Sequence, residues 1–212
     1  MAEPTGLSPE QIRALATLRG VAELSGFYLA GGSAVAVHLG HRRSIDLDLF
    51  SREPDVDLGD MGSRLVALLA SSEVVAATDA AFTLRQGDLA IDVVRYPYAL
   101  LDEPAPGPEG FPIAGLRDLA AMKLSAIAKR GIKRDFWDLH EILHASPIDL
   151  ERAFDAYVEK FGVHQADLYH VMRALTYFED ADREQVFPSG LTRKRWELIK
   201  GYFRHAAPLR LA

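Results

Sequence analysis

The chain has 212 residues, of which 49% are hydrophobic, and its 30 acidic and 24 basic residues give a net charge of -6. This composition provides for a sizeable buried core and argues against general affinity for nucleic acid, while the absence of cysteine excludes disulfides and thiolate chemistry. Because no leader pattern and no apolar run near the ~20 residues of a membrane span occur, we expect a cytoplasmic protein that contacts no membrane.

The first half of the chain alternates between predicted helices and strands. Ser8, Pro9 and Gln11 predict a capped helix start, and the helix is expected to reach about Leu24. A strand over 27–30, a helix over 33–39, a strand over 46–50 and a helix over 58–69 follow. Three further strands are predicted over 74–78, 81–86 and 89–96, the last two joined by a turn at Gly87-Asp88.

The second half is predicted to be helical. Five prolines and two glycines between 97 and 112 predict a linker. Helices are expected after it, over about 117–130, 135–144, 149–161, 165–180 and 192–205. The predicted fold class is therefore α+β, with a mixed-sheet core over 1–112 and an all-helical domain over 113–212.

A glycine-rich turn, Gly31-Gly32-Ser33, directly follows the first predicted strand. Backbone N–H groups at such a strand-to-helix turn can bind a phosphate. The turn therefore predicts a phosphate site.

Two carboxylates follow on the next strand. Asp46 and Asp48 fall on one face of this strand, and the apolar Ile45, Leu47 and Leu49 fall on the other. Two residues along a strand span roughly 6.6 Å, at which two negative charges repel by about 2.5 kcal/mol at an effective dielectric of ~20. A divalent cation removes this repulsion, whereas the alternative is an acid pair on a solvated strand face.

A third carboxylate, Asp92, interrupts the apolar strand over 89–94. An acid in such a strand is expected to be paired or to bind metal. Three acids on two strands could hold magnesium for two-metal phosphoryl or nucleotidyl transfer. The alternative for Asp92 is a salt bridge to an arginine such as Arg85.

These motifs resemble those of a known superfamily. Gly-Gly-Ser followed by Arg42-x-Ser44-x-Asp46-Leu-Asp48 resembles the nucleotidyltransferases of the DNA polymerase β type. The later run from Asp118 through Lys123 and Arg130 to Arg134-Asp135-x-x-Asp138 is similar to the AbiEii/MenT group of toxin nucleotidyltransferases, found in abortive-infection and toxin–antitoxin systems. The resemblance covers roughly residues 27–143.

The resemblance implies transfer of a nucleotidyl group from an NTP, with Mg²⁺ or Mn²⁺, to an acceptor such as tRNA, and a cognate antitoxin as partner. The implied catalytic residues are Asp46, Asp48, Asp92 and Lys123, the three acids being also the metal ligands. The implied nucleotide contacts are Gly31, Gly32, Ser33, Arg42, Ser44, Lys123 and Arg130. Arg134, Asp135 and Asp138 are implied to support these contact residues without touching the nucleotide. A small-molecule or protein acceptor, or an inactive binding module of the same fold, remains the alternative.

A cationic row on the first predicted helix of the second half supports the same reading. Lys123, Arg130 and Arg134 project on one side of a continued helix, although Gly131 can interrupt it. A solvated face with ordinary ion pairs is the alternative, and we prefer it for Lys129 and Lys133. Asp135 and Asp138 also fit as acids in the first turn of a helix.

Two other features leave their alternatives open. His140-Glu141-x-x-His144 matches a zinc-peptidase motif, but no third ligand follows at suitable spacing, and two histidines on a partly exposed helix face is the preferred interpretation. From Leu191 onward six basic residues face one acid, Glu197. This segment either binds a polyanion such as RNA or docks on the acidic remainder of the chain.

Overall fold

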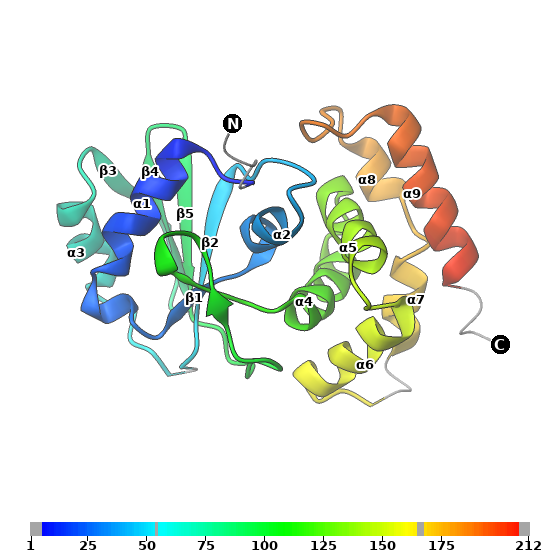
Figure 1. Cartoon of the computed structure of the whole chain (residues 1–212), viewed down its shortest axis with the longest axis horizontal. Helices are drawn as coiled ribbons and strands as arrows, with labels where there is room; N and C mark the ends of the chain where they lie inside the picture. Colours follow the sequence, from blue (N-terminus) through cyan, green and yellow to red (C-terminus); the bar gives the residue numbers. More distant parts are fainter. Residues whose placement is uncertain (1–5, 54, 165–167, 208–212) are drawn as a thin grey trace. The chain divides into compact units, whose positions relative to one another are not determined.

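The computed structural model describes residues 6–53, 55–164 and 168–207. It divides into two compact units, Met1–Gly115 and Leu116–Ala212. The described part of the first unit contains a seven-stranded mixed sheet, and the described part of the second is helical (Figure 1). The predicted α+β class is therefore confirmed.

The sheet of the first unit has the strand order β3-β4-β5-β2-β1-β7-β6. Strand β2 lies between β1, to which it runs antiparallel, and β5, to which it runs parallel. The strands are β1 (Phe27–Leu29), β2 (Asp46–Ser51), β3 (Ser72–Ala77), β4 (Ala81–Gln86), β5 (Leu89–Val94), β6 (Ala105–Pro106) and β7 (Pro112–Ile113). The helices are α1 (Pro9–Arg19), α2 (Gly31–Leu39) and α3 (Met61–Leu68), with short 3₁₀ turns η1 (Ala22–Leu24) and η2 (Pro108–Gly110).

Helix α1 begins as predicted and ends early. The Ser8 hydroxyl accepts from the Gln11 N–H, and the Gln11 side chain accepts from the Ser8 N–H, which completes the capping box. The helix ends at Arg19, and the prediction that it continues to Leu24 is wrong. Gly20 occupies the C-cap because glycine is a poor helix former, and the chain resumes as the separate turn η1.

The predicted linker over 97–112 is also wrong in part, because the segment supplies strands. Ile113 of β7 pairs in parallel with Leu29 of β1, and Ala105 of β6 pairs with Ile113 on its other side. These strands were not predicted because their prolines indicate a loop. Proline is nevertheless tolerated on edge strands, where one row of N–H groups faces away from the neighbouring strand. The segment therefore completes one side of the sheet.

The second unit contains α4 (Leu116–Lys129), α5 (Lys133–Ala145), α6 (Leu150–Phe161), α7 (Leu168–Ala174), α8 (Glu179–Arg183) and α9 (Arg193–Ala206). The helix predicted over 165–180 is wrong: residues 165–167 lie outside the described part, and the rest forms α7 and the start of α8. Between them the N–H groups of Thr176 and Tyr177 bond to carbonyls three residues back, which ends α7. No described helix is long and apolar enough to cross a membrane.

Aromatic side chains form much of the core between α5 and α9. Phe136 packs edge-on against Trp196 and Phe203, with ring centroids 5.8 and 5.7 Å apart, and all three are at most 1% exposed. Such tilted pairs add to the apolar burial that joins the two helices.

Candidate functional site

The three predicted carboxylates lie on one face of the sheet in the first unit. Asp48 of β2 is directly opposite Asp92 of β5, and Asp46 is opposite Ala90. Because in-register neighbours in a parallel pair share a face, the three acids point the same way, while Leu47 is fully buried on the other face. The prediction that Ile45 belongs to the apolar face is wrong, because Ile45 precedes β2 and is 57% exposed.

Asp92 is stabilised by a neighbouring strand. The Thr83 hydroxyl of β4 donates to Asp92 Oδ1 at 2.6 Å. Burial raises the pKa of Asp92 above its ordinary value, the Thr83 hydrogen bond opposes this, and the Asp48 charge raises the pKa further. Arg85 is exposed on the same strand, opposite Ala90, and within the described residues Asp92 forms no ion pair with it. The salt-bridge alternative therefore does not apply.

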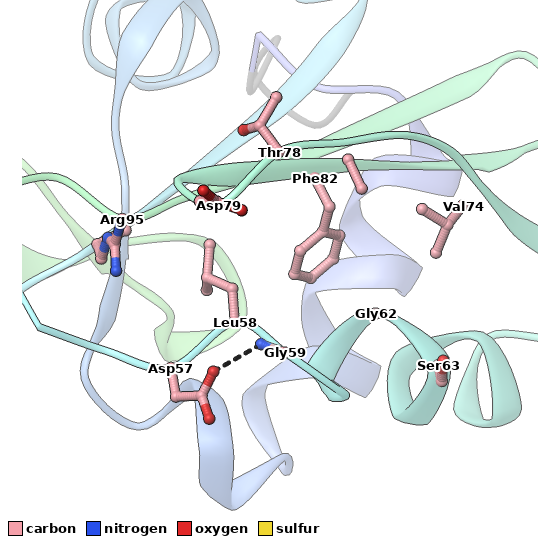
Figure 2. Close-up of a pocket in the computed structure, with 11 residues that line it drawn as sticks. Asp57, Leu58, Gly59, Gly62, Ser63, Val74, Thr78, Asp79, Phe82 and Arg95 are labelled. Atoms are coloured by element: carbon pink, nitrogen blue, oxygen red, sulfur yellow. Dashed lines mark hydrogen bonds between the residues drawn. The ribbon is translucent and has the colours of Figure 1, made fainter.

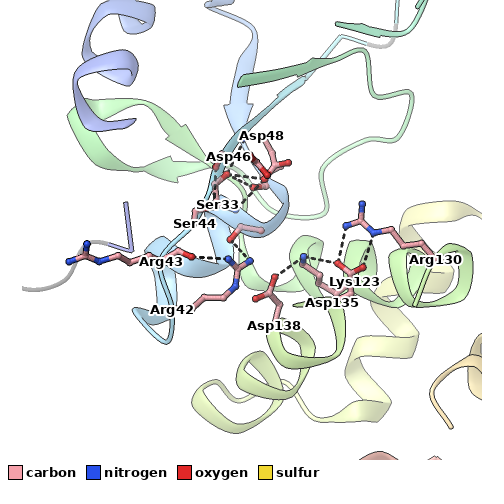
Figure 3. Close-up of polar contacts among 12 residues, drawn as sticks. Ser33, Arg42, Arg43, Ser44, Asp46, Asp48, Lys123, Arg130, Asp135 and Asp138 are labelled. Carbon is pink, nitrogen blue, oxygen red and sulfur yellow. Dashed lines mark hydrogen bonds and ion pairs between the residues drawn. The ribbon is translucent and has the colours of Figure 1, made fainter. Parts of the chain in front are cut away.

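The glycine-rich turn contacts Asp48 directly. Both the N–H and the hydroxyl of Ser33 donate to Asp48 Oδ2, at 3.2 and 3.1 Å (Figure 3). Gly31 has φ +54°, and a Cβ there would lie 2.6 Å from the Asp48 carboxylate. The start of α2 is therefore built against this acid, and only glycine leaves room for it.

Arg42 and Ser44 support the same turn and strand from the connecting loop. The Arg42 guanidinium donates to the carbonyls of Gly32 and Arg43, at 3.3 and 3.1 Å, and the side chain is buried. The Ser44 hydroxyl donates to the Asp46 carbonyl at 2.9 Å. Their predicted role as nucleotide contacts stays a prediction, and the contacts described here hold the loop in place.

Sequence reasoning did not identify Gln11 as part of this arrangement. Its buried side chain donates to the carbonyls of Ser44 and Asp46, at 3.5 and 3.3 Å, in addition to capping α1. Its capping role offered a complete explanation, and no local pattern indicates the second contact.

The acids could bind a divalent ion whose remaining coordination positions are filled by substrate. Among the described residues, no three His, Cys, Asp or Glu side chains are grouped closely enough to hold a metal by themselves. Magnesium is usually bound by one or two carboxylates together with water and substrate phosphates, not by an all-protein cage. Asp48 and Asp92 lie side by side and provide such an acidic pair. The charge of Asp48 contributes to the raised pKa of Asp92.

A pocket of about 520 Å³ lies on the other face of the same sheet (Figure 2). Phe82, which alternates with Thr83 along β4, forms part of its apolar wall with Leu58 and Val74. Its lining contains none of the three acids, so we do not place the chemistry there.

In the second unit, Lys123 lies at the centre of a buried ion network (Figure 3). Its ammonium is 3.1 Å from Asp135 Oδ1 and 2.7 Å from Asp138 Oδ2, and both acids are fully buried. The Arg130 guanidinium donates to both oxygens of Asp135, at 2.8 and 3.1 Å. Burial raises the pKa of Asp135, but Lys123 and Arg130 outweigh it and lower the pKa below 3.8. These acids therefore hold Lys123, whose predicted contact with a triphosphate stays a prediction.

The cationic row is not one continuous helix. Helix α4 ends at Lys129, Gly131 adopts φ +50°, and Arg134 lies in the first turn of the next helix, which begins at Lys133. A left-handed glycine ends the helix here because it satisfies the terminal carbonyls without steric cost. Lys123 and Arg130 nevertheless lie close together, because both side chains bind the Asp135 carboxylate. Their proximity does not come from positions on one continuous helix.

Two buried lysines were missed. Lys133, predicted to be on a solvated face, is 1% exposed and donates to the carbonyls of Ala181 and Glu184, the latter at 2.8 Å. Lys160 pairs with Asp118 at 2.6 Å, and neither side chain is exposed. Their partners lie tens of residues away in sequence, so no local pattern indicates them.

The basic residues of α9 are partly neutralised within the second unit. Arg195 pairs with Glu141 at 2.8 Å, and Lys200 lies 3.1 Å from Asp182 and 2.9 Å from Glu197. The apolar side of α9 packs on α5. Arg193 and Lys194 remain exposed. The docking alternative therefore fits Arg195 and Lys200, whereas Arg204 is exposed as well. Arg210 lies outside the described residues.

Comparison with known proteins finds a family model and a relative that match this chain. Residues 85–210 match the model described as "Nucleotidyl transferase AbiEii toxin, Type IV TA system". An uncharacterized protein of Aquifex aeolicus (strain VF5), aq_aa25, is 32% identical over 200 residues, which span 93% of this chain and 94% of that protein.

Two solved structures share the fold. The nucleotidyltransferase toxin MenT4 of Mycobacterium tuberculosis H37Rv superposes with a TM-score of 0.65 at 16% identity, covering 94% of this chain and 82% of that one. The antibiotic-resistance factor ANT(2'')-Ia superposes with a TM-score of 0.55 at 16% identity, covering 76% of this chain and 96% of that one. At these identities the likeness supports the fold alone.

Proposed function

Because the chain belongs to the AbiEii nucleotidyltransferase toxin family, we propose that it transfers a nucleotidyl group from an NTP to RNA, with Mg²⁺ or Mn²⁺ as cofactor. One observation supports the proposal above the others. Asp48 and Asp92 lie side by side on neighbouring strands, Asp46 lies on the same face, and the start of α2 is built against Asp48.

In the proposed reaction, an acceptor hydroxyl oxygen bonds to the α-phosphorus of the NTP. The bond from that phosphorus to the bridging oxygen breaks, pyrophosphate leaves, and the hydroxyl proton passes to a nearby base. A bound divalent ion would neutralise the charge that develops on the phosphate oxygens. Asp48 and Asp92, with Asp46 on the same face, would hold this ion together with water and the substrate phosphates.

The remaining residues of the first unit prepare this face. Ser33 fixes the Asp48 carboxylate, and Thr83 fixes that of Asp92. The N–H groups of Gly31 and Gly32, in the first turn of α2, are suited to a phosphate oxygen because the first N–H groups of a helix lack intrahelical partners. Lys123 and Arg130 would act on the triphosphate, as the family resemblance implies.

The family description also supports a partner. We propose that the protein acts as the toxin of a toxin–antitoxin pair. Expression of the chain alone should arrest growth of the host cell, and the Asp48→Asn variant should not. Growth arrest by both versions would mean that toxicity does not depend on the proposed reaction.

The test of the reaction is a transfer assay. Purified protein is incubated with each labelled NTP, MgCl₂ and total cellular RNA, and label in RNA is measured. Wild type should label RNA with one or more of the NTPs. Asp48→Asn should reduce labelling to background because it removes a charge that the metal requires, whereas the amide can still accept from Ser33.

The matched control is Asp88→Asn, which removes an acid from the exposed hairpin turn between β4 and β5. It should keep full activity. The circular dichroism spectrum and melting temperature of Asp48→Asn should stay close to wild type, because the variant also removes the repulsion from Asp92. Full activity of Asp48→Asn, or full activity of wild type in excess chelator, would contradict the proposal.

A further inference from the structure

Strand β3 forms an open edge of the sheet in the first unit. It is the outermost strand of the described sheet and pairs with β4, so one row of its backbone N–H and C=O groups faces outward. Its residues Val74 and Val75 are 40% and 43% exposed. Open edges can pair with another chain, and proteins commonly protect them with lysine or proline. The six residues of β3, Ser-Glu-Val-Val-Ala-Ala, include neither.

The pocket of about 520 Å³ on the sheet face opposite the acids borders this edge (Figure 2). Val74 and Ala77 of β3 line it together with Phe82 of β4, and Gly62 lines it from α3. A Cβ at Gly62 would lie 3.1 Å from Val74 Cγ2 and 3.6 Å from Phe82 Cδ2. The helix therefore approaches both side chains closely, and the pocket has an apolar wall beside the open strand.

The opposite end of the pocket is polar. Asp57, Asp79 and Arg95 line it, and Figure 2 shows Asp79 and Arg95 on the side away from Val74. The loop over 53–60, which contributes Asp57, contains four acids and no basic residue. This end therefore has a surplus of negative charge, which complements a cationic partner.

We propose that β3 and this pocket bind an extended, basic segment of a partner protein. The segment adds a strand to the outer edge of β3 through backbone hydrogen bonds, and it places an apolar side chain against Val74 and Phe82. A lysine or arginine two or four residues away points to the same face of the added strand and pairs with Asp57 or Asp79. In this mode of recognition the backbone provides affinity and alternate side chains provide specificity.

Two features favour a short basic segment over a second copy of β3. The pairing of β3 with β4 shifts register between Val74 and Ala76, and such a bulge interrupts the row of backbone groups that a long partner strand needs. A second copy would also bring its own surplus of negative charge, and like charges oppose association. The pocket lies on the sheet face opposite Asp48 and Asp92, so binding of this segment does not depend on the proposed transfer reaction.

The test begins with a random peptide library displayed on phage, selected on the immobilised full-length protein. The most enriched peptide is synthesised and titrated into wild type by calorimetry. Enriched peptides should share an apolar residue with a lysine or arginine two or four positions away, and their affinity should fall as salt rises. The amide NMR signals of residues 72–77 should shift on binding, because the peptide pairs with that backbone.

Val74→Arg should weaken binding of this peptide by at least about tenfold, as expected for a residue central to an interface. The variant replaces part of the apolar wall by a cation that repels a basic segment. Val75→Arg is the matched control, because it makes the same change at the neighbouring exposed residue, which is not part of the pocket lining. It should retain most of the affinity, and circular dichroism should show that both variants are folded.

The charge of the pocket is tested separately. Asp57→Asn/Asp79→Asn should reduce both the affinity and its salt dependence. Asp55→Asn/Asp60→Asn removes two exposed acids of the same loop that do not line the pocket, and it should bind the peptide more tightly than the first pair.

Three results would overturn the proposal. The first is a selection that enriches no peptide or only peptides without basic residues. The second is equal affinity of the enriched peptide for wild type and Val74→Arg. The third is a wild-type dimer in sedimentation that Val74→Arg dissociates, because a second copy would then occupy the edge.

Discussion

Gly31 shows how a single backbone conformation determines the position of a functional group. Its φ of +54° turns the chain from β1 into α2, and its missing side chain leaves the space that the Asp48 carboxylate fills. Ser33, two residues on, then donates twice to that carboxylate. The motif is therefore a packing device for an acid as much as a place for a phosphate.

Gly31→Ala should destabilise the first unit and displace Asp48. The left-handed backbone costs about 1–2 kcal/mol for a residue with a side chain, and the contact with Asp48 should add about 1–3 kcal/mol. Gly87→Ala is the control, because Gly87 has φ +58° with nothing within 4 Å of the added Cβ. The two unfolding free energies are compared in urea, and equal losses would mean that Asp48 moves aside at no cost.

A second residue-scale prediction concerns acid pH. The folded-state pKa of Asp135 is lowered, so the stabilisation that it provides is complete above its ordinary pKa of 3.8 and is lost as pH falls through the folded value. Asp135→Asn, which breaks a buried pair, should cost about 3–5 kcal/mol at neutral pH. Urea unfolding of both proteins should show this difference shrinking below about pH 4. A difference that is constant with pH would show that lost packing, not charge, is responsible.

The placement of Asp46, Asp48 and Asp92 on one strand face each could be predicted from sequence. Each acid alternates with apolar residues, and this alternation predicts both the strand and the face. Gln11 and Thr83 could not be recognised in this way. Each is an ordinary residue for its helix or strand, and its contact with the acid region depends on pairing between distant segments.

At the scale of elements, agreement between prediction and structure follows the strength of the local signal. Strand β4 and the hairpin to β5 were predicted because alternation and a two-residue turn at Gly87-Asp88 are local features. Strands β6 and β7 were missed because two residues cannot show a period and prolines suggest a loop. Their pairing depends on β1, some eighty residues earlier in the chain.

Lys133 illustrates the same limit for helices and leads to a prediction. Its ammonium joins the start of α5 to the carbonyls of Ala181 and Glu184. Lys133→Met should lower the unfolding free energy by about 2–4 kcal/mol, because the buried Ala181 carbonyl and the partly buried Glu184 carbonyl lose their donor. Lys129→Met, at an exposed position of α4, should change it by no more than about 0.5 kcal/mol. Similar stability of the two variants would show that water replaces the ammonium.

At the scale of the whole molecule, the distribution of charge bears on the acceptor. The chain has a net charge of -6, and ion pairs within the second unit engage Arg195 and Lys200 of α9. The cations of this helix that are exposed and outside these ion pairs are Arg193, Lys194 and Arg204, and electrostatic binding of RNA by the start of the helix would rely on the first two.

Replacing Arg193 and Lys194 by Gln should reduce the salt dependence of RNA binding. Each phosphate contact contributes about 0.7–0.9 to the slope of log affinity against log salt, so two lost contacts should lower it by about 1.4–1.8. Arg85→Gln/Lys129→Gln removes two exposed cations elsewhere and should leave the slope unchanged. If the first pair also leaves it unchanged, the acceptor is bound by another surface or is not RNA.

The late position of β7 has a consequence for biosynthesis. Strand β1 needs β7 on its outer side, and β7 ends at Ile113, just before the first unit ends at Gly115. A nascent chain that has emerged only to Val94 already contains β1 to β5 but leaves the backbone groups of β1 open to other chains. The ribosome must release nearly the whole first unit before that edge is covered. Translation pauses between residues 95 and 113 would therefore prolong the state in which nascent chains are most prone to associate.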